Sequence, residues 1–276
     1  MPARLNGGHK GTYGRVLVIG GSSGLSGAAA MTSMAALKAG AGLVTLAVPA
    51  SLHDLMEVKL TEVMTRSLPE TEEVSVSLEA LDAAQELAET ADVLALGPGM
   101  STNDSTVAFI RQLLLILKKP AVVDADGLNA LVGDLDVIKE HQAPLVLTPH
   151  PGEMARLLGI KTEEVQNNRI EIALETAKKW NAVIVLKGAG TVIASPEGSL
   201  YVNSTGNPGM ASGGTGDVLT GIIAGLLAQG LSPLNAAVAG VYFHGSAGDL
   251  AANEKGMLSL VAGDLLEFLP QITKQF

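Results

Sequence analysis

Short apolar runs alternate with longer amphipathic segments along most of this chain. Runs rich in valine, isoleucine, leucine and alanine predict buried strands at residues 15–21, 42–48, 61–67, 91–97, 120–126, 143–149 and 182–188. The segments between them have the apolar spacing of helices, at residues 26–40, 78–90, 104–118, 152–158 and 163–180. Strands that alternate with helices predict a mostly parallel sheet with helices on both faces.

The pattern changes after Lys187. Residues 191–195 and 199–203 are short apolar runs on either side of the turn sequence "PEGS", which predicts an antiparallel hairpin in the C-terminal part of the chain. Helical patterns then fill the rest of the chain, at residues 215–229, 233–252 and 261–268. No repeat or linker interrupts the sequence, so we predict a single α/β domain over residues 1–276.

Composition adds expectations about surface and partners. Charged residues make up 17% of the chain, below the roughly 25% of ordinary globular domains. A surface poor in charge indicates burial between subunits, and we therefore expect a homo-oligomer. The net charge of −10, without a basic tract, argues against nucleic-acid binding, because contacts with phosphate supply most of that affinity.

The sequence also bounds the compartment. The chain has no cysteine, which excludes disulfides and thiolate catalysis and fits a reducing cytoplasm. We see no signal peptide, and the longest apolar run, residues 218–231, is shorter than the roughly 20 residues that a membrane span requires. We expect a cytoplasmic protein without a membrane partner.

Glycine-rich sequences stand at the ends of five of the predicted strands. They are "GGSSG", "GPG", "DADG", "TPHPGE" and "KGAG". In parallel α/β sheets, ligands bind outside the carboxyl ends of the strands. The agreement among these loops predicts a ligand site along that edge of the sheet.

Residues 213–217, "GGTGD", open an apolar helix. The first N–H groups of a helix have no partner within it, and the helix dipole places partial positive charge there. Glycines let the backbone approach an anion closely, so the sequence predicts a phosphate or oxyanion hole. Asp217 would take the proton of a substrate hydroxyl, and the helix N-terminus would keep this carboxylate ionised. The alternative interpretation is a tight turn in which Asp217 only complements the helix dipole.

Two further loops carry charged groups. "KGAGT", residues 187–191, places a cation and two glycines after a strand, so it could hold a nucleotide phosphate or ribose or form a hairpin turn. "TPHPGE", residues 148–153, ends on Glu153, which could orient a hydrated Mg²⁺ ion. The alternative for Glu153 is the first turn of a helix after a proline turn.

"GGSSG", residues 20–24, fits the G-x-S-x-G pattern of serine hydrolases. A triad would then combine Ser22 with Asp217 and His244, in the chain order that this pattern requires. The same glycines and serines also suit a phosphate-binding turn. The dinucleotide fingerprint G-x-G-x-x-G is absent.

Taken together, these motifs resemble one family. "HKGTYGRVLVIGGSSGLSGAAAM", "LGPGM", "TPHPGEMARL", "VLKGAGTVI" and "NSTGNPGMASGGTGDVLTGIIAGLLAQG" look like the ADP/ATP-dependent NAD(P)H-hydrate dehydratases, hydro-lyases of the ribokinase-like superfamily. The resemblance implies a ribokinase-like fold and repair of hydrated NADH and NADPH. In that scheme a nucleotide phosphorylates the ring hydroxyl, and phosphate then leaves to restore the double bond.

The resemblance also implies roles for individual residues. The base would be Asp217, in an anion hole formed by Gly214, Thr215 and Gly216. The hydrated dinucleotide would contact Ala28, Gly99, His150 and Asp217. The AMP part of the nucleotide would contact Lys187, Gly188, Ala189, Gly190, Thr191 and Gly216. Glu153 takes the acid position of the superfamily's N-x-x-E magnesium motif, in which His150 here replaces the asparagine, and its contact with Mg²⁺ could pass through water.

Partners follow from the same resemblance. Bacterial members typically use ADP, and we expect ADP rather than ATP as the donor, with a homotetramer as the assembly. Only about 14 residues precede the first predicted strand, so we expect the epimerase that many relatives carry to be a separate protein. The alternative activities are a small-molecule kinase of the ribokinase-like superfamily and a serine hydrolase that uses Ser22.

Overall fold

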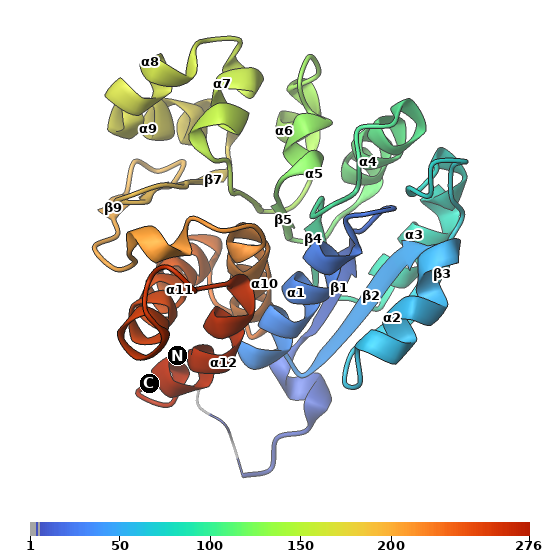
Figure 1. The fold of residues 1–276 in the computed structure, drawn as a ribbon. Helices are drawn as coiled ribbons and strands as arrows, with labels where there is room; N and C mark the ends of the chain where they lie inside the picture. Colours follow the sequence, from blue (N-terminus) through green and yellow to red (C-terminus); the bar gives the residue numbers. More distant parts are fainter. Residues whose placement is uncertain (1–3, 5) are drawn as a thin grey trace.

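The computed structural model describes residue 4 and residues 6–276. They contain a nine-stranded sheet in the order β3-β2-β1-β4-β5-β6-β7-β8-β9 (Figure 1). The strands are β1 (Arg15–Ile19), β2 (Leu43–Pro49), β3 (Met64–Leu68), β4 (Val93–Leu96), β5 (Ala121–Val123), β6 (Leu145–Leu147), β7 (Val183–Leu186), β8 (Val192–Ala194) and β9 (Leu200–Val202). Strands β1 to β7 pair in parallel, and β8 and β9 are antiparallel to their neighbours.

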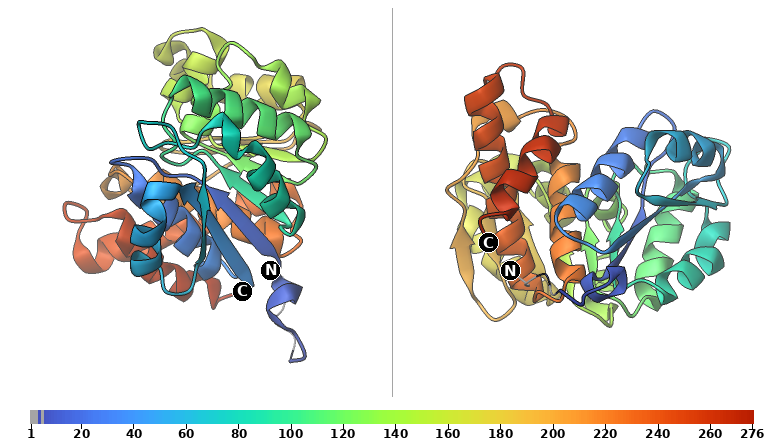
Figure 2. Two further views of the ribbon diagram at one scale, coloured as in Figure 1. Left: turned by 90° about the vertical axis from the view of Figure 1, so that its right-hand side faces the viewer. Right: turned by 90° about the horizontal axis from the view of Figure 1, so that it is seen from below.

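The α-helices cover both faces of this sheet (Figures 1 and 2). On one face lie α1 (Ser26–Lys38), α2 (His53–Lys59), α10 (Thr215–Ala228), α11 (Pro233–Lys255) and α12 (Ala262–Thr273). On the other lie α3 (Leu81–Glu89), α4 (Asp104–Ile116), α5 (Asp126–Asn129), α6 (Asp136–Glu140), α7 (Pro151–Leu158), α8 (Thr162–Asn167) and α9 (Arg169–Trp180). Short 3₁₀ helices are η1 (Lys10–Tyr13), η2 (Ala50–Leu52), η3 (Leu78–Ala80) and η4 (Pro208–Met210).

The two faces produce two hydrophobic cores from a single set of strands. Successive side chains of a strand point to opposite faces, so Val16 and Val18 join the core under α1 and α10, while Leu17 and Ile19 join the core under α3 and α4. Because both faces are covered, strand β1 is apolar at nearly every position rather than alternating. The predicted α/β class, the mostly parallel sheet and the C-terminal antiparallel hairpin are confirmed.

One predicted helix is wrong in its continuity. Residues 163–180 form two helices, α8 and α9, with a break at Asn168, whose backbone angles are φ −127° and ψ 35°. The Asn168 side chain donates its amide N–H to the carbonyl of Glu164 at 3.1 Å, a local bond that competes with the helical ladder. The break matters for function because it places Arg169 at the start of α9.

Helices α1 and α10 pack in close contact through small residues. A Cβ atom at Gly221 would lie 2.1 Å from the carbonyl oxygen of Thr32, and one at Gly225 would lie 2.6 Å from the carbonyl oxygen of Ala36. Neither position therefore accepts a side chain without displacing backbone. Two of the glycines in the apolar helix α10 thus serve helix packing. Within the described part of the chain, none of the helices combines the length and the apolar character needed to span a bilayer.

Candidate active site

Three charged side chains meet beyond the ends of β5, β6 and β7. Asp124 follows β5 and is 1% exposed. Its Oδ1 accepts a hydrogen bond from Nζ of Lys187 at 2.6 Å, and its Oδ2 accepts one from the Thr220 hydroxyl at 2.7 Å. Nζ of Lys187 also lies 3.7 Å from Oε2 of Glu153. We call Asp124, Lys187 and Glu153 the buried charge cluster.

Lys187 stays charged within this cluster. Burial alone favours its neutral form, but the negative charges of Asp124 and Glu153 and the hydrogen bond that Lys187 donates to Asp124 outweigh burial, so the pKa of Lys187 is raised. Removing either carboxylate would leave the ammonium group poorly compensated. The sequence had drawn attention to the "DADG" loop, but it did not single out Asp124 or Thr220 as members of the site.

Asp217 lies in the first turn of α10 and is partly buried. Burial raises its pKa, the negative charge of Asp124 raises it further, and Lys187 offsets only part of this, so the pKa of Asp217 is about 7. The expectation that the helix N-terminus keeps this carboxylate firmly ionised is therefore wrong, because desolvation and like charge dominate. A carboxyl group with this pKa can hold or accept a proton near neutral pH.

The backbone around Asp217 has the form of an anion hole. Gly214 adopts φ 92°, and a Cβ atom there would lie 2.7 Å from Sδ of Met31, so the position requires glycine. A Cβ atom at Gly216 would lie 3.4 Å from Nζ of Lys187, which brings this glycine beside the buried charge cluster. The N–H groups of the first helical turn have no partner within the helix. Positive charge and free donors therefore meet at the N-terminus of α10.

Two side chains hold this turn in shape. The Thr215 hydroxyl lies within hydrogen-bond distance of the carbonyls of Met210 (3.1 Å) and Ser212 (3.0 Å), so it bonds to the preceding loop. His244 on α11 donates Nε2–H to the carbonyl of Thr215 at 2.8 Å. Burial lowers the pKa of His244 to about 4, so its imidazole is neutral. Because neither Thr215 nor His244 carries a charge, the positive potential at this turn comes from the N-terminus of α10 and from Lys187.

The geometry gives no support to a serine hydrolase. Ser22 is 3% exposed. In the described part of the chain no hydrogen bond joins Ser22 to His244, whose Nε2 donates instead to Thr215. A triad needs the histidine to accept a proton from the serine hydroxyl.

His150 caps helix α7. Its Nδ1 accepts hydrogen bonds from the N–H groups of Gly152 (3.0 Å) and Glu153 (3.2 Å), and Oε2 of Glu153 accepts one from the N–H of His150 (2.7 Å). This reciprocal capping explains the local sequence "HPGE". Burial lowers the pKa of His150, and its ring keeps Nε2–H on the half-exposed side chain. Nε2 of His150 lies 3.4 Å from Oε1 of Glu153, so this N–H is near that carboxylate.

Glu153 is poorly disposed for direct metal ligation. Its side chain is 6% exposed, one oxygen is taken by the N–H of His150, and the ammonium of Lys187 is nearby. Among residue 4 and residues 6–276, no group of three or more acidic or histidine side chains is arranged to hold a metal ion. Mg²⁺ commonly keeps its waters and binds through substrate phosphates, so the site fits a water-mediated contact.

Three of the four residues expected to contact the dinucleotide lie close together. A Cβ atom at Gly99, in the loop after β4, would lie 3.2 Å from Cβ of Ala28 on α1. The Thr32 hydroxyl is within hydrogen-bond distance of the carbonyls of both Ala28 (3.0 Å) and Asp217 (3.1 Å). Ala28, Gly99 and Asp217 thus border one region.

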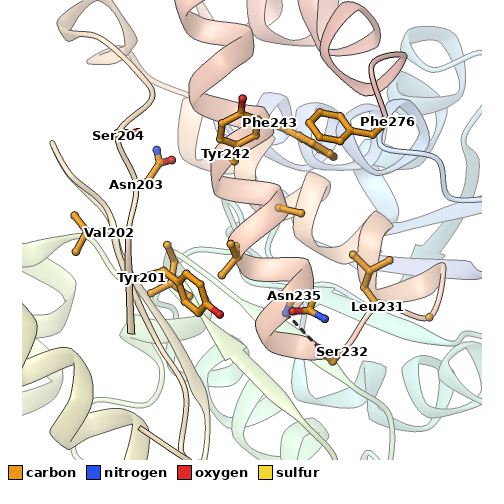
Figure 3. A pocket seen from close by; sticks show the side chains of 14 residues that line it. Tyr201, Val202, Asn203, Ser204, Leu231, Ser232, Asn235, Tyr242, Phe243 and Phe276 are labelled. Atoms are coloured by element: carbon orange, nitrogen blue, oxygen red, sulfur yellow. Dashed lines mark hydrogen bonds between the residues drawn. The ribbon is translucent and has the colours of Figure 1, made fainter. Parts of the chain in front are cut away.

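A cavity of about 860 Å³ lies elsewhere, between the β8–β9 hairpin and α11 (Figure 3). Aromatic side chains dominate its wall, namely Tyr201, Tyr242, Phe243 and Phe276. No Lys, Arg, His, Asp or Glu side chain lines it, and none of the expected site residues does so. We call it the aromatic groove. Its volume does not make it the site of chemistry, because it lacks acidic, basic and histidine side chains.

Comparison with known proteins assigns the chain to a family. Residues 16–271 match the model of the NAD(P)H-hydrate dehydratase family. The bifunctional NAD(P)H-hydrate repair enzyme of Moorella thermoacetica is 56% identical over 274 residues, which are 99% of this chain and 52% of that protein. The chain therefore spans about half the length of that relative. The ADP-dependent (S)-NAD(P)H-hydrate dehydratase of Bacillus subtilis is 35% identical over 276 residues, 100% of this chain and 95% of that protein.

Solved structures give the same result. An ADP/ATP-dependent NAD(P)H-hydrate dehydratase from B. subtilis, co-crystallised with ATP and Mg²⁺, superimposes with a TM-score of 0.86 at 33% identity, covering 100% of this chain and 94% of that one. Ribokinase from Thermotoga maritima superimposes with a TM-score of 0.54 at 14% identity, covering 93% and 99%. The second likeness establishes a ribokinase-like fold alone.

Proposed function

Because the chain belongs to the NAD(P)H-hydrate dehydratase family, we propose that it is an ADP-dependent (S)-NAD(P)H-hydrate dehydratase that regenerates NADH and NADPH. The observation that carries this proposal is the N-terminus of α10. There a carboxyl group with a pKa near 7 adjoins unpaired backbone donors and the ammonium of Lys187. Proton removal from a hydroxyl and stabilisation of a phosphoryl group need these two features side by side.

The reaction proceeds in two stages. Asp217 accepts the proton of the ring hydroxyl, whose oxygen then forms a bond to the terminal phosphorus of ADP while the bond to the AMP oxygen breaks. Phosphate afterwards leaves with the electron pair of the carbon–oxygen bond, and loss of a proton from the adjacent ring carbon restores the double bond. The N–H groups of Gly214, Thr215 and Gly216 stabilise the negative charge on the transferring phosphoryl oxygens.

The remaining residues bind and orient. Ala28, Gly99 and His150 contact the hydrated dinucleotide, and the half-exposed side chain of His150 supports this contact. The turn of Lys187 to Thr191, together with Gly216, holds the AMP part of the nucleotide. Glu153 would hold, through water, a Mg²⁺ ion bound with the nucleotide phosphates, and that ion would neutralise phosphate charge.

A direct assay tests the proposal. The purified protein is mixed with hydrated NADH, Mg²⁺ and either ADP or ATP, and the return of reduced-nicotinamide absorbance is followed. We expect recovery with ADP and slower recovery with ATP. Absence of recovery with both nucleotides refutes the activity. A phosphorylated dinucleotide that accumulates without recovery would instead identify a kinase.

The assembly and setting are proposals of the same kind. The nine-stranded sheet supports one ribokinase-like domain over residues 1–276. Leu200, Tyr201 and Val202 of edge strand β9 are exposed beside the aromatic groove, which supports a homo-oligomer, for which we propose a tetramer. Light scattering measures the mass, and a monomer at micromolar concentration contradicts this. We further propose a cytoplasmic enzyme.

A further inference from the structure

Arg169 stands in an electrostatically unfavourable place. It is the first residue of α9, where the helix dipole puts partial positive charge, so a cation there is disfavoured. Burial also lowers the pKa of Arg169, although a guanidinium keeps its charge in a protein. A cation held against the dipole and partly out of water requires compensating contacts.

Most of the compensating contacts lie at the turn after β7. One terminal nitrogen of Arg169, Nη2, donates to the carbonyls of Leu186 (2.9 Å) and Gly190 (3.3 Å), and Nη1 donates to the carbonyl of Lys187 (3.2 Å). Nη1 also lies 3.2 Å from Oε1 of Gln166. The planar guanidinium therefore joins both ends of the turn.

Glycine at position 188 makes this approach possible. A Cβ atom there would lie 2.9 Å from Nη1 of Arg169, and the residue adopts φ 139°, which side chains disfavour. The Thr191 hydroxyl accounts for a further carbonyl, because it donates to the oxygen of Gly188 at 3.0 Å. The carbonyls of residues 186, 187, 188 and 190 thus all accept hydrogen bonds from side chains of the protein.

Two of the N–H groups of this turn are left free. In a trans peptide the carbonyl and the following N–H point in opposite directions. The peptide between Leu186 and Lys187 illustrates this, since its carbonyl meets Arg169 while its N–H donates to the carbonyl of Pro149 at 2.9 Å. The peptides after Lys187 and Gly190 likewise direct the N–H groups of Gly188 and Thr191 away from Arg169. In the described chain these two N–H groups donate no hydrogen bond.

We propose that Arg169 is a positioning residue for the nucleotide. By holding the carbonyls of the turn, it leaves the N–H groups of Gly188 and Thr191 as backbone donors with no competing acceptor, suited to a nucleoside diphosphate. It also fixes the backbone of Lys187, whose side chain completes the buried charge cluster. This inference rests on the proposed function for its ligand, but the arrangement of the turn is independent of it.

The test replaces Arg169 with lysine, which keeps the positive charge but lacks the planar guanidinium with its two terminal nitrogens. We expect the Kd and the KM for ADP to rise about 10-fold, while the KM for hydrated NADH stays within about 2-fold. A purely structural defect lowers the amount of folded enzyme, and hence the apparent kcat, without changing either KM. The matched control is Arg111→Lys, because Arg111 also donates to two backbone carbonyls, those of Ala130 and Val132. The loop that holds these carbonyls carries no proposed site residue.

Amide hydrogen exchange provides a readout that does not need activity. The N–H groups of Lys187 and Asn203 bond to the carbonyls of Pro149 and Thr191, so they report the order of the turn. We expect exchange at both to accelerate about 10-fold in Arg169→Lys and to stay unchanged in Arg111→Lys. If Arg169→Lys does not fold, Arg169→Gln, which keeps a planar donor, replaces it in the same measurements.

The outcomes separate the two proposals. Unchanged exchange together with an unchanged Kd for ADP overturns the role of Arg169. Accelerated exchange with an unchanged Kd also overturns it, because the turn would then be ordered by Arg169 without serving the nucleotide. If the wild-type protein binds neither ADP nor ATP, the proposed function fails and the positioning role for the nucleotide fails with it, while the exchange data still show whether Arg169 orders the turn.

Discussion

The buried charge cluster and the aromatic groove differ in the kind of side chain that forms them. The cluster packs Asp124, Lys187 and Glu153 at the carboxyl ends of strands, with little exposed area. The groove has a volume of about 860 Å³ and no Lys, Arg, His, Asp or Glu side chain on its wall. Burying charge costs free energy, whereas burying aromatic rings releases it. Proteins retain buried charged side chains where their chemistry requires them. The position of the buried charges therefore locates the proposed active site better than cavity volume does.

The largest expected effect is at Asp217. Asp217→Asn keeps the shape of the side chain but cannot accept a proton, so we expect kcat to fall about 10³-fold while the Kd for ADP changes little. Steady-state assays and calorimetry measure the two quantities. Asp136→Asn, the same change at an exposed carboxylate that pairs with Lys139, serves as the control and should be neutral. Near-normal turnover in Asp217→Asn would remove this residue from the mechanism.

The second effect concerns stability. Lys187→Met leaves Asp124 and Glu153 buried without their counter-charge, and breaking such a pair costs about 3–5 kcal/mol. At roughly 2–4 °C per kcal/mol, the Tm should fall by roughly 10 °C. The matched control is Lys255→Met, which breaks an ion pair with Asp264 nearer the surface and should lower the Tm less. Equal losses in the two variants would contradict a special role for burial.

The third effect is a pH dependence. The pKa of Asp217 is raised to about 7, and only its ionised form accepts the substrate proton. Activity is therefore lost as pH falls below 7, by about 10-fold per pH unit in kcat/KM, and it levels off above. The profile is measured between pH 5.5 and 8.5 on the wild-type enzyme. A flat profile would mean that another group, or none, is the base.

The smallest effect is expected in the aromatic groove. Tyr242 is 44% exposed on its wall, and Tyr242→Ser removes the ring without touching a proposed site residue. We expect kcat and both KM values to stay within about 2-fold of the wild type, while the mass by light scattering falls if the groove lies between subunits. A loss of turnover at unchanged mass and fold would show that the groove takes part in catalysis.

The sequence predicted the parts of this molecule that depend on local pattern. Strands buried on both faces are continuous apolar runs, so β1 and its neighbours were located to within a few residues. Asp217 and Lys187 were visible because each stands beside glycines at the end of an element. The break at Asn168 was missed, because a single side-chain hydrogen bond decides it within an otherwise helical pattern.

Long-range pairing could not be predicted in the same way. The hydrogen bond from Thr220 to Asp124 joins residues 96 positions apart. Arg169 bonds to backbone carbonyls, which every residue has, so no residue type in the sequence indicates its partners. The pKa of Asp217 likewise depends on how closely Asp124 approaches and how much water the fold removes. A sequence names candidate groups, while their protonation is a property of the assembled fold.

The close packing of α1 against α10 limits which substitutions the protein can accept near this site. Ala28 on α1 and Asp217 on α10 border the same region, and the missing side chains at Gly221 and Gly225 allow the two helices to lie in direct contact. A substitution at either glycine would push α1 away from α10 and so displace Ala28 relative to Asp217, although neither glycine is itself a proposed ligand contact. The tolerance of the site to mutation is therefore set partly by residues that have no side chain at all.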